Sequence, residues 1–190
     1  MRFIDFVHSV KLDLYRYTAK TSLLLLLKNL VFNPGFKYSF WMRLCAYLSK
    51  HSLYKYTIFP ISWIMLARYR YRYGIEIPFE TQIGGDLYIG HFGGILVHPC
   101  AVIGKNFSIS PGVVIGQTNR GERKGYPTIG DNVYVAPGAK VIGNINIGNN
   151  VAIGANAVVT KDVPDNAVVI GVPGRIVSYE GAEGYLLNPI

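Results

Sequence analysis

The sequence is poor in the residues that build metal sites, disulfide frameworks and membrane spans. Only two cysteines, Cys45 and Cys100, occur in 190 residues, and their separation favours a reducing cytoplasm over a disulfide or metal framework. The apolar runs 23–27 and 58–67, the second interrupted by Pro60, fall far short of the roughly 20 residues that a spanning helix needs. We therefore expect a cytoplasmic protein that holds no metal.

Acidic residues are scarce in the first part of the chain. Residues 1–73 carry twelve Lys and Arg against only Asp5 and Asp13, a net charge of +10, whereas residues 74–190 carry a net charge of −2. The first part also holds seventeen of the twenty-five aromatic residues. The basic residues are spread among apolar runs and match no nucleic-acid-binding motif, so we expect no nucleic-acid partner.

Residues 1–73 have the pattern of several helices, with turns at 33–35 and around Pro60. Basic and aromatic side chains together suit an anionic membrane surface, where each Lys or Arg contributes about 1 kcal/mol, so a peripheral membrane contact is one interpretation. Two others stay open. The helices could pack on the rest of the chain and leave a solvated basic rim, or they could form a subunit interface.

A β-branched aliphatic residue returns every six positions through the second part of the chain, with two interruptions. The thirteen residues are Ile77, Ile83, Ile89, Val97, Ile103, Ile109, Ile115, Ile129, Val135, Val141, Ile147, Ile153 and Val159. This period does not fit an α-helix, with its period of about 3.6, and it is the spacing of hexapeptide β-helix repeats. It predicts a mainly β fold, a parallel β-helix whose Ile and Val side chains fill a narrow prism, preceded by an α-helical region.

Asparagine marks the expected corners of this prism. Asn106, Asn132 and Asn150 each follow a repeat aliphatic by three positions. Because Asn tolerates positive φ better than other non-glycine residues, these positions predict turns.

Two steps in the repeat are longer than six residues. The step between Ile89 and Val97 spans eight residues and contains 91–94, and a later step spans fourteen residues and contains 117–126. A regular prism gains nothing from extruded residues, so we expect the functional site at these two places.

Three segments make the chain resemble the hexapeptide-repeat acyltransferases, and within them the serine acetyltransferase-like branch. These segments are residues 91–97, 136–144 and 171–177, and the resemblance covers about residues 74–177. It implies a left-handed β-helix, a homotrimer with active sites between subunits, and acetyl transfer from acetyl-CoA to a hydroxyl or an amine.

Histidine is the expected general base of such a transfer, because its pKa suits removal of a hydroxyl proton near neutral pH. The repeat region holds only His91 and His98, and His91 lies in the eight-residue step, where the resemblance places the catalytic histidine. Glu76 stands at the position of the family's catalytic Asp, so we expect it to orient the ring of His91. His98, beside Pro99, is expected at the surface, and two histidines are too few for a metal site built from three.

Small residues mark candidate positions for coenzyme A along the repeats, although corner packing explains them equally well. These residues are Ala136, Gly138, Gly154 and Ala155. Lys161 and Arg175 are the cationic candidates for the nucleotide phosphates.

The resemblance is incomplete at the acceptor site. Serine acetyltransferases carry an Asp before the catalytic His and an Arg-His pair at the end of the long loop, and this chain has Gly90, Gly125 and Tyr126 there. An unpaired buried charge is costly, so we predict an acceptor other than serine. The basic first third also looks more like the colanic-acid and capsule acetyltransferases, whose acceptors are sugar hydroxyls, commonly on a lipid carrier. We expect Gly90, Gln117 and Tyr126 to line the acceptor pocket.

The sequence therefore predicts an acetyl-CoA-dependent O-acetyltransferase. Its predicted acceptor is a sugar of an exopolysaccharide or capsule, or the lipid-linked precursor, at the inner face of the cytoplasmic membrane. Serine as the acceptor and a non-catalytic β-helix scaffold remain alternatives. We expect a basic, aromatic-rich helical region at 1–73, a left-handed β-helix acetyltransferase domain at 74–171 and a C-terminal cap or tail at 172–190.

Overall fold

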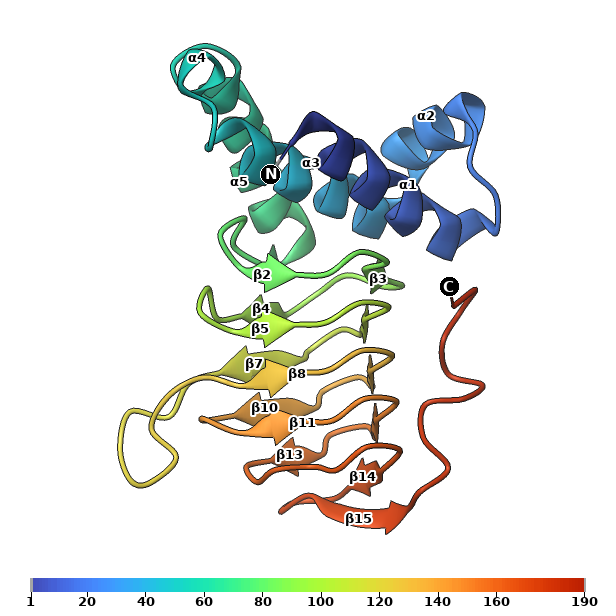
Figure 1. Ribbon diagram of the computed structural model, residues 1–190, viewed down its shortest axis with the longest axis vertical. Coiled ribbons are helices and arrows are strands. Elements are labelled where there is room, and N and C mark those ends of the chain that lie inside the picture. Colours follow the sequence, from blue (N-terminus) through green and yellow to red (C-terminus); the bar gives the residue numbers. More distant parts are fainter. Residues whose placement is uncertain (1, 190) are drawn as a thin grey trace.

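The computed structural model describes residues 2–189, in which a layer of helices lies on one end of a column of stacked coils (Figure 1). The helices are α1 (Phe3–Thr18), α2 (Leu23–Phe32), α3 (Pro34–Leu48), α4 (Ser52–Lys55) and α5 (Ile58–Tyr73). The strands are β1 (Ile75–Glu76), β2 (Gln82–Ile83), β3 (Tyr88–Ile89), β4 (Ile95–Val97), β5 (Val102–Ile103), β6 (Ser108–Ile109), β7 (Val114–Gly116), β8 (Thr128–Ile129), β9 (Tyr134–Val135), β10 (Lys140–Ile142), β11 (Asn146–Ile147), β12 (Ala152–Ile153), β13 (Val158–Val159), β14 (Val168–Ile170) and β15 (Arg175–Ser178).

The strands form three sheets through which the chain passes in turn. The β1 sheet has the order β1-β4-β7-β10-β13, the β2 sheet the order β2-β5-β8-β11, and the β3 sheet the order β3-β6-β9-β12-β14-β15. Neighbouring strands are parallel except β14 and β15, which are antiparallel. The parallel sheets and the N-terminal helices are confirmed, and their arrangement is consistent with a left-handed β-helix.

The repeat aliphatics lie in the core of the column. Twelve of the thirteen are buried, with at most 3% of the side chain exposed, and Ile83 is half-buried. Each such burial contributes about 1.5–3 kcal/mol relative to an exposed side chain. The predicted corners are confirmed as well, because Asn106, Asn132 and Asn150 have φ values of 56°, 59° and 53°.

The helices begin and end at residues suited to those places. The Asn33 side chain accepts a hydrogen bond from the Phe36 amide at 3.2 Å, so the turn predicted at 33–35 is where α2 ends and α3 begins. Gly74, with φ of +60°, ends α5 and leads directly into β1. Among the described residues, no helix is long and apolar enough to cross a membrane.

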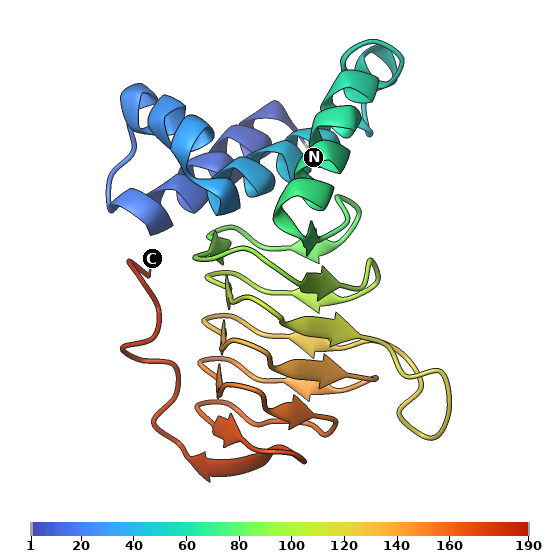
Figure 2. The same cartoon turned by 180° about the vertical axis from the view of Figure 1, so that it is seen from behind.

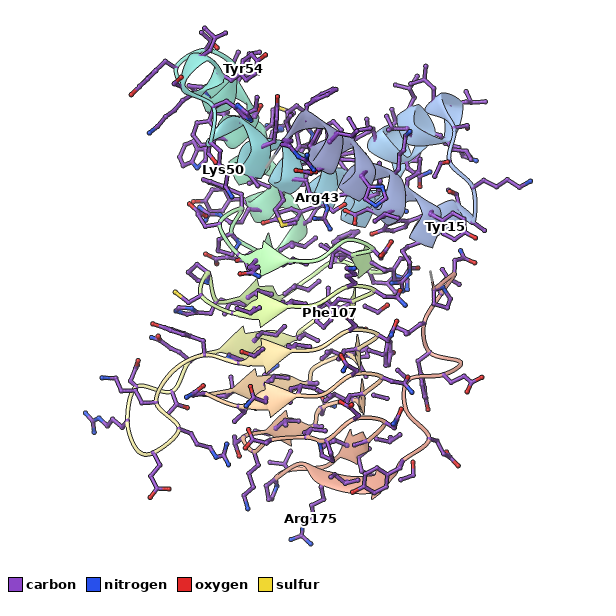
Figure 3. All side chains as sticks on the ribbon, viewed as in Figure 1. Tyr15, Arg43, Lys50, Tyr54, Phe107 and Arg175 are labelled. Atoms are coloured by element: carbon purple, nitrogen blue, oxygen red, sulfur yellow. The ribbon has the colours of Figure 1, made fainter. Side chains whose placement is uncertain are left out.

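A buried ion pair joins two helices to the first coil. The Asp13 carboxylate on α1 accepts hydrogen bonds from Arg43 Nε at 2.6 Å and Arg43 Nη2 at 2.8 Å, and also from the Leu87 amide at 2.9 Å. Arg43 also donates to the Gly84 carbonyl at 2.7 Å, and it lies between α3 and the first coil (Figure 3). The helical layer is therefore attached to the column by polar as well as apolar contacts.

Arg16 forms a second buried connection, between α1, the column and the C-terminal tail. Its guanidinium donates to the Leu187 carbonyl at 2.6 Å, to the Asp86 carbonyl and to Ser108 Oγ, both at 2.8 Å, and to Asn106 Oδ1. Burial lowers the pKa of this guanidinium. One side chain thus fixes three parts of the chain that are far apart in sequence.

The tail after β15 runs back along the column to the helical layer (Figures 1 and 2). The Gly181 amide donates to the Asn166 carbonyl at 2.9 Å, and the ring of Tyr185 stacks on Tyr134 with centroids 5.2 Å apart. The tail therefore covers one side of the column in addition to closing its end at β15.

Candidate functional site

His91 lies at the corner between β3 and β4, in the turn that the eight-residue step produces. Gly93 and Gly94 follow with φ values of 120° and 65°, a conformation open to glycine and strained for other residues. The turn is fixed to the next coil because the Gly93 carbonyl accepts a hydrogen bond from the Gly112 amide at 2.8 Å. His91 and the preceding predicted acceptor residue, Gly90, are both exposed, so the imidazole can meet a ligand from solvent.

Glu76 lies on β1, where it pairs in register with Leu96 of β4. Its carboxylate is half-exposed, at 52%, and lies 3.6 Å from Arg70 Nη1. Glu76 and Gly94, the last residue of the His91 turn, line the same cavity of about 540 Å³ between α5 and the β1 sheet. Within residues 2–189, no hydrogen bond joins Glu76 to His91.

Aromatic rings hold the His91 turn against α5. Tyr73 stacks on Tyr69 with ring centroids 5.5 Å apart and lies 5.3 Å from the ring of Phe92. The helix that carries Arg70 is therefore packed directly on the turn that carries His91. The helical layer sets the shape of this part of the candidate site.

The fourteen-residue step forms a loop that projects from the column after β7 (Figure 1). Its base is closed by two hydrogen bonds between the backbones of Thr118 and Gly125, at 3.0 and 3.1 Å. An ion pair of 3.1 Å between Arg123 and Asp162 ties the loop to a later coil. The Asn146 amide and Arg123 together lower the pKa of the Asp162 carboxyl.

The two predicted acceptor residues of this loop occupy its two ends. Gln117 is exposed just after β7, and Tyr126 precedes β8. The Tyr126 ring stacks on His98, with centroids 4.5 Å apart and planes 24° apart. His98 Nδ1 in turn accepts a hydrogen bond from the Cys100 amide at 3.1 Å. His98 therefore fixes the end of the loop, a role that residue spacing did not suggest.

The structure does not bring the two extended steps together within one chain. His91 lies where the chain enters the β1 sheet from β3, and 117–126 lies where the chain leaves that sheet for β8. These are different corners of the three-sided column. Within residues 2–189, no hydrogen bond or ring contact joins residues 90–94 to residues 117–126.

The small residues predicted to mark coenzyme A are largely engaged in the coils. The amides of Ala136, Gly138 and Gly154 each donate at 2.8 Å to a carbonyl of a neighbouring coil. Ala155 is exposed at a corner. Three of the four backbone amides therefore already donate hydrogen bonds within the coils, so these small residues can contact a ligand mainly through van der Waals packing.

Lys161 and Arg175 are brought together at the far end of the column. Both line a cavity of about 290 Å³ with Asp162, and Arg175 points away from the column in Figure 3. Within the β1 sheet, β13 is three strands beyond β4, a distance of about 14 Å along the column. The cationic pair and His91 are therefore well separated along one molecule.

Arg70 is a charged residue of the candidate site that the sequence reasoning did not single out. It lines the cavity beside Glu76, and its Nη2 donates to the Tyr71 hydroxyl at 3.4 Å, which raises the pKa of the guanidinium. Its position in the last turn of the helix that leads into the repeats could have indicated a place near the site. In the described part of the chain, no three His, Cys, Asp or Glu residues gather where they could hold a metal.

Comparisons with known proteins agree with this architecture. Residues 126–161 match the family described as bacterial transferase hexapeptide (six repeats). The chain is 43% identical to a serine acetyltransferase of Staphylococcus xylosus over 136 residues, which is 72% of this chain and 63% of that protein. The chain thus spans less than two thirds of that relative's length.

Two solved structures are similar over almost the whole chain. A serine acetyltransferase of Neisseria gonorrhoeae in complex with serine has a TM-score of 0.74 and 29% identity, and it covers 93% of this chain and 70% of its own. A serine acetyltransferase of Brucella abortus in complex with coenzyme A has a TM-score of 0.74 and 27% identity, covering 93% and 69%.

These relatives correct the prediction of a sugar acceptor and of a closer likeness to polysaccharide acetyltransferases. That prediction assumed that Gly90, Gly125 and Tyr126 line a buried pocket, where the charges of serine would lack partners. It also took these three positions as the only possible partners of those charges, whereas the structure places a further cation, Arg70, in the cavity beside Glu76 and the His91 turn. The repeats, the fold and the relatives place this chain in the hexapeptide-repeat transferase family, with serine acetyltransferases among its homologues.

Proposed function

We propose that the protein is an acetyltransferase that moves the acetyl group of acetyl-CoA to the hydroxyl of serine. The observation that carries this proposal is the 43% identity to a serine acetyltransferase over 136 residues. The likeness to structures that hold serine or coenzyme A supports both substrates.

His91 is the general base in this proposal. Its imidazole removes the proton from serine Oγ while that oxygen attacks the thioester carbonyl. The carbon–sulfur bond then breaks, and the coenzyme A thiolate leaves and takes up the proton. The exposure of His91 and the two glycines behind it leave room for both substrates.

Glu76 orients the imidazole, and Arg70 binds the carboxylate of serine. Both line the cavity beside the His91 turn, and the 3.6 Å separation between them is a weak ion pair that a ligand can replace. A guanidinium suits a carboxylate because it can donate two parallel hydrogen bonds. Arg70 thus supplies a cation that Gly125 and Tyr126 do not.

The active unit is a homotrimer of left-handed coils in this proposal. The support is the placement of His91 and Tyr126 at different corners of the column, which a neighbouring subunit can bring together. Coenzyme A then lies in the groove between subunits, over Ala136, Gly138, Gly154 and Ala155. Its phosphates reach Lys161 and Arg175, and the separation of about 14 Å suits a long, thin arm.

The test is release of free coenzyme A from acetyl-CoA by the wild-type chain. L-serine should accelerate the release, whereas D-serine and a panel of simple sugars should not. Acceleration by a sugar with none by L-serine would refute the proposed acceptor. Sedimentation at several concentrations should show a trimer, and an active monomer would refute the shared site.

A further inference from the structure

Helix α2 is apolar on the side that faces solvent as well as on the side that faces the protein. None of its ten residues is buried. Leu25, Leu26 and Leu30 pack in part against α1 and α3. The opposite side exposes large apolar side chains, namely Leu23 at 73%, Leu24 at 78%, Leu27 at 52%, Val31 at 60% and Phe32 at 77%.

A second exposed apolar area lies on α4 and the first half of α5. It consists of Leu53, Tyr56, Ile58, Ile61, Trp63 and Ile64. We call this area and the exposed side of α2 together the outer apolar surface. Helix α2 lies at one lateral end of the helical layer and α4 with the start of α5 at the other, both at the end of the molecule away from β15 (Figures 1 and 2).

The charge around the outer apolar surface has one sign. Both carboxylates between residues 2 and 73 are paired with an arginine, Asp13 with Arg43 at 2.6 Å inside the layer and Asp5 with Arg2 at 3.1 Å at its surface. The exposed cations of the same helical layer include Lys20, Lys28, Lys50, Lys55, Arg68 and Arg72. Lys50 lies beside the α4 end of the layer in Figure 3.

Exposed apolar side chains surrounded by cations favour a lipid surface over a second copy of the chain as the partner of this surface. A second copy docked through the same face by a two-fold axis would bring cations against cations. An anionic lipid surface would accept the aliphatic side chains between its acyl chains and pair the Lys and Arg side chains with phosphates. Because both carboxylates in the described part of the layer are paired with arginines, no unpaired negative charge there repels the anionic lipid.

We propose that the helical layer binds the surface of an anionic phospholipid bilayer, with α2 inserted at the interface and the column pointing away. This goes beyond the proposed acetyl transfer and does not depend on it. The exposed Leu, Val and Phe of α2 supply the apolar contact, and the surrounding lysines select anionic lipid.

Vesicle flotation of the full chain tests the proposal. The protein should float with vesicles of phosphatidylcholine and phosphatidylglycerol and stay behind with phosphatidylcholine alone. Binding should weaken in salt near 1 M, where the Debye length is about 3 Å. Lys28→Gln should lower the partition coefficient about fivefold, and Val31→Gln about fivefold to tenfold.

Two substitutions on the column are matched controls. Val177 on β15 is 55% exposed, close to the 60% of Val31, and Lys105 is exposed at a corner of the column. Val177→Gln and Lys105→Gln should leave vesicle binding unchanged. Acetyl transfer to soluble serine should be the same in all four variants, which separates this proposal from the proposed function.

Three results would overturn the proposal. The first is equal binding to neutral and anionic vesicles, and the second is no binding to either. The third is a loss of vesicle binding in Val177→Gln and Lys105→Gln as large as in Val31→Gln and Lys28→Gln. Self-association that Val31→Gln abolishes, without vesicle binding by the wild type, would identify a second copy as the occupant. Circular dichroism of each variant confirms that a loss of binding is not a loss of fold.

Discussion

Replacing Asp13 by Asn should loosen the helical layer from the column. The carboxylate is 1% exposed and its partner Arg43 is 7% exposed, so the substitution leaves a buried guanidinium without its counter-ion. Removing one member of a buried pair costs about 3–5 kcal/mol of unfolding free energy. Asn keeps an oxygen that can still accept from the Leu87 amide, so we expect the lower end, about 3 kcal/mol.

Urea unfolding followed by tryptophan fluorescence measures this loss. Both tryptophans, Trp41 on α3 and Trp63 on α5, lie in the helical layer and report on it directly. With a denaturant slope of about 1–3 kcal/mol per M, a loss of about 3 kcal/mol lowers the urea midpoint by about 1–3 M.

The exposed pair of Arg2 and Asp5 provides the control. Its side chains are 83% and 40% exposed, so Asp5→Asn should leave the urea midpoint almost unchanged. If Asp13→Asn and Asp5→Asn lower stability equally, the buried pair does not hold the layer in place. Asp13→Asn combined with Arg43→Met should cost less than the sum of the single changes, because the two residues share one interaction.

Three further predictions follow from individual side chains. Burial raises the pKa of the Asp86 carboxyl above its ordinary value near 3.8. Between the pKa of the unfolded state and the higher pKa of the folded state, the folded state therefore binds more protons, so the free energy of unfolding increases as the pH falls through this range. Asp86→Asn should therefore raise the urea midpoint at pH 7, and this gain should shrink as the pH approaches 3.8; a constant gain would contradict it. Burial raises the pKa of the Cys45 thiol to about 12, and Cys100 is exposed, so Ellman's reagent should titrate Cys100 alone in the native chain and both thiols after unfolding. Tyr126→Ala should raise the KM for serine more than Tyr126→Phe, which keeps the stack on His98; equal effects would show that the stack does not position the loop.

The six-residue period was sufficient to predict the column because its physical cause is local. A narrow prism requires one branched aliphatic per strand, and Ile89, Ile109 and Val135 stack in register as that requirement dictates. The corner asparagines follow from backbone sterics in the same way. These features need no knowledge of distant contacts, so residue spacing reveals them.

The connections between distant segments could not be predicted in this way. Arg16 meets Leu187 across 171 positions, and no local pattern indicates that the tail returns to α1. The partner of Glu76 likewise depends on how α5 packs, which places Arg70 beside the carboxylate. The prediction of an acceptor other than serine overlooked Arg70 for the same reason, because no local pattern shows that this side chain lines the cavity beside the His91 turn.

The roles of the candidate site residues stay predictions, and their central member is His91. Its side chain is exposed, and it has no hydrogen bond to another residue within 2–189, so replacing it should leave the fold intact. The decisive measurement is coenzyme A release from acetyl-CoA and L-serine by His91→Asn beside the wild type. We expect kcat to fall about 10²–10⁴-fold with unchanged sedimentation and unfolding, as expected for loss of a general base. Turnover at the wild-type rate would contradict the account.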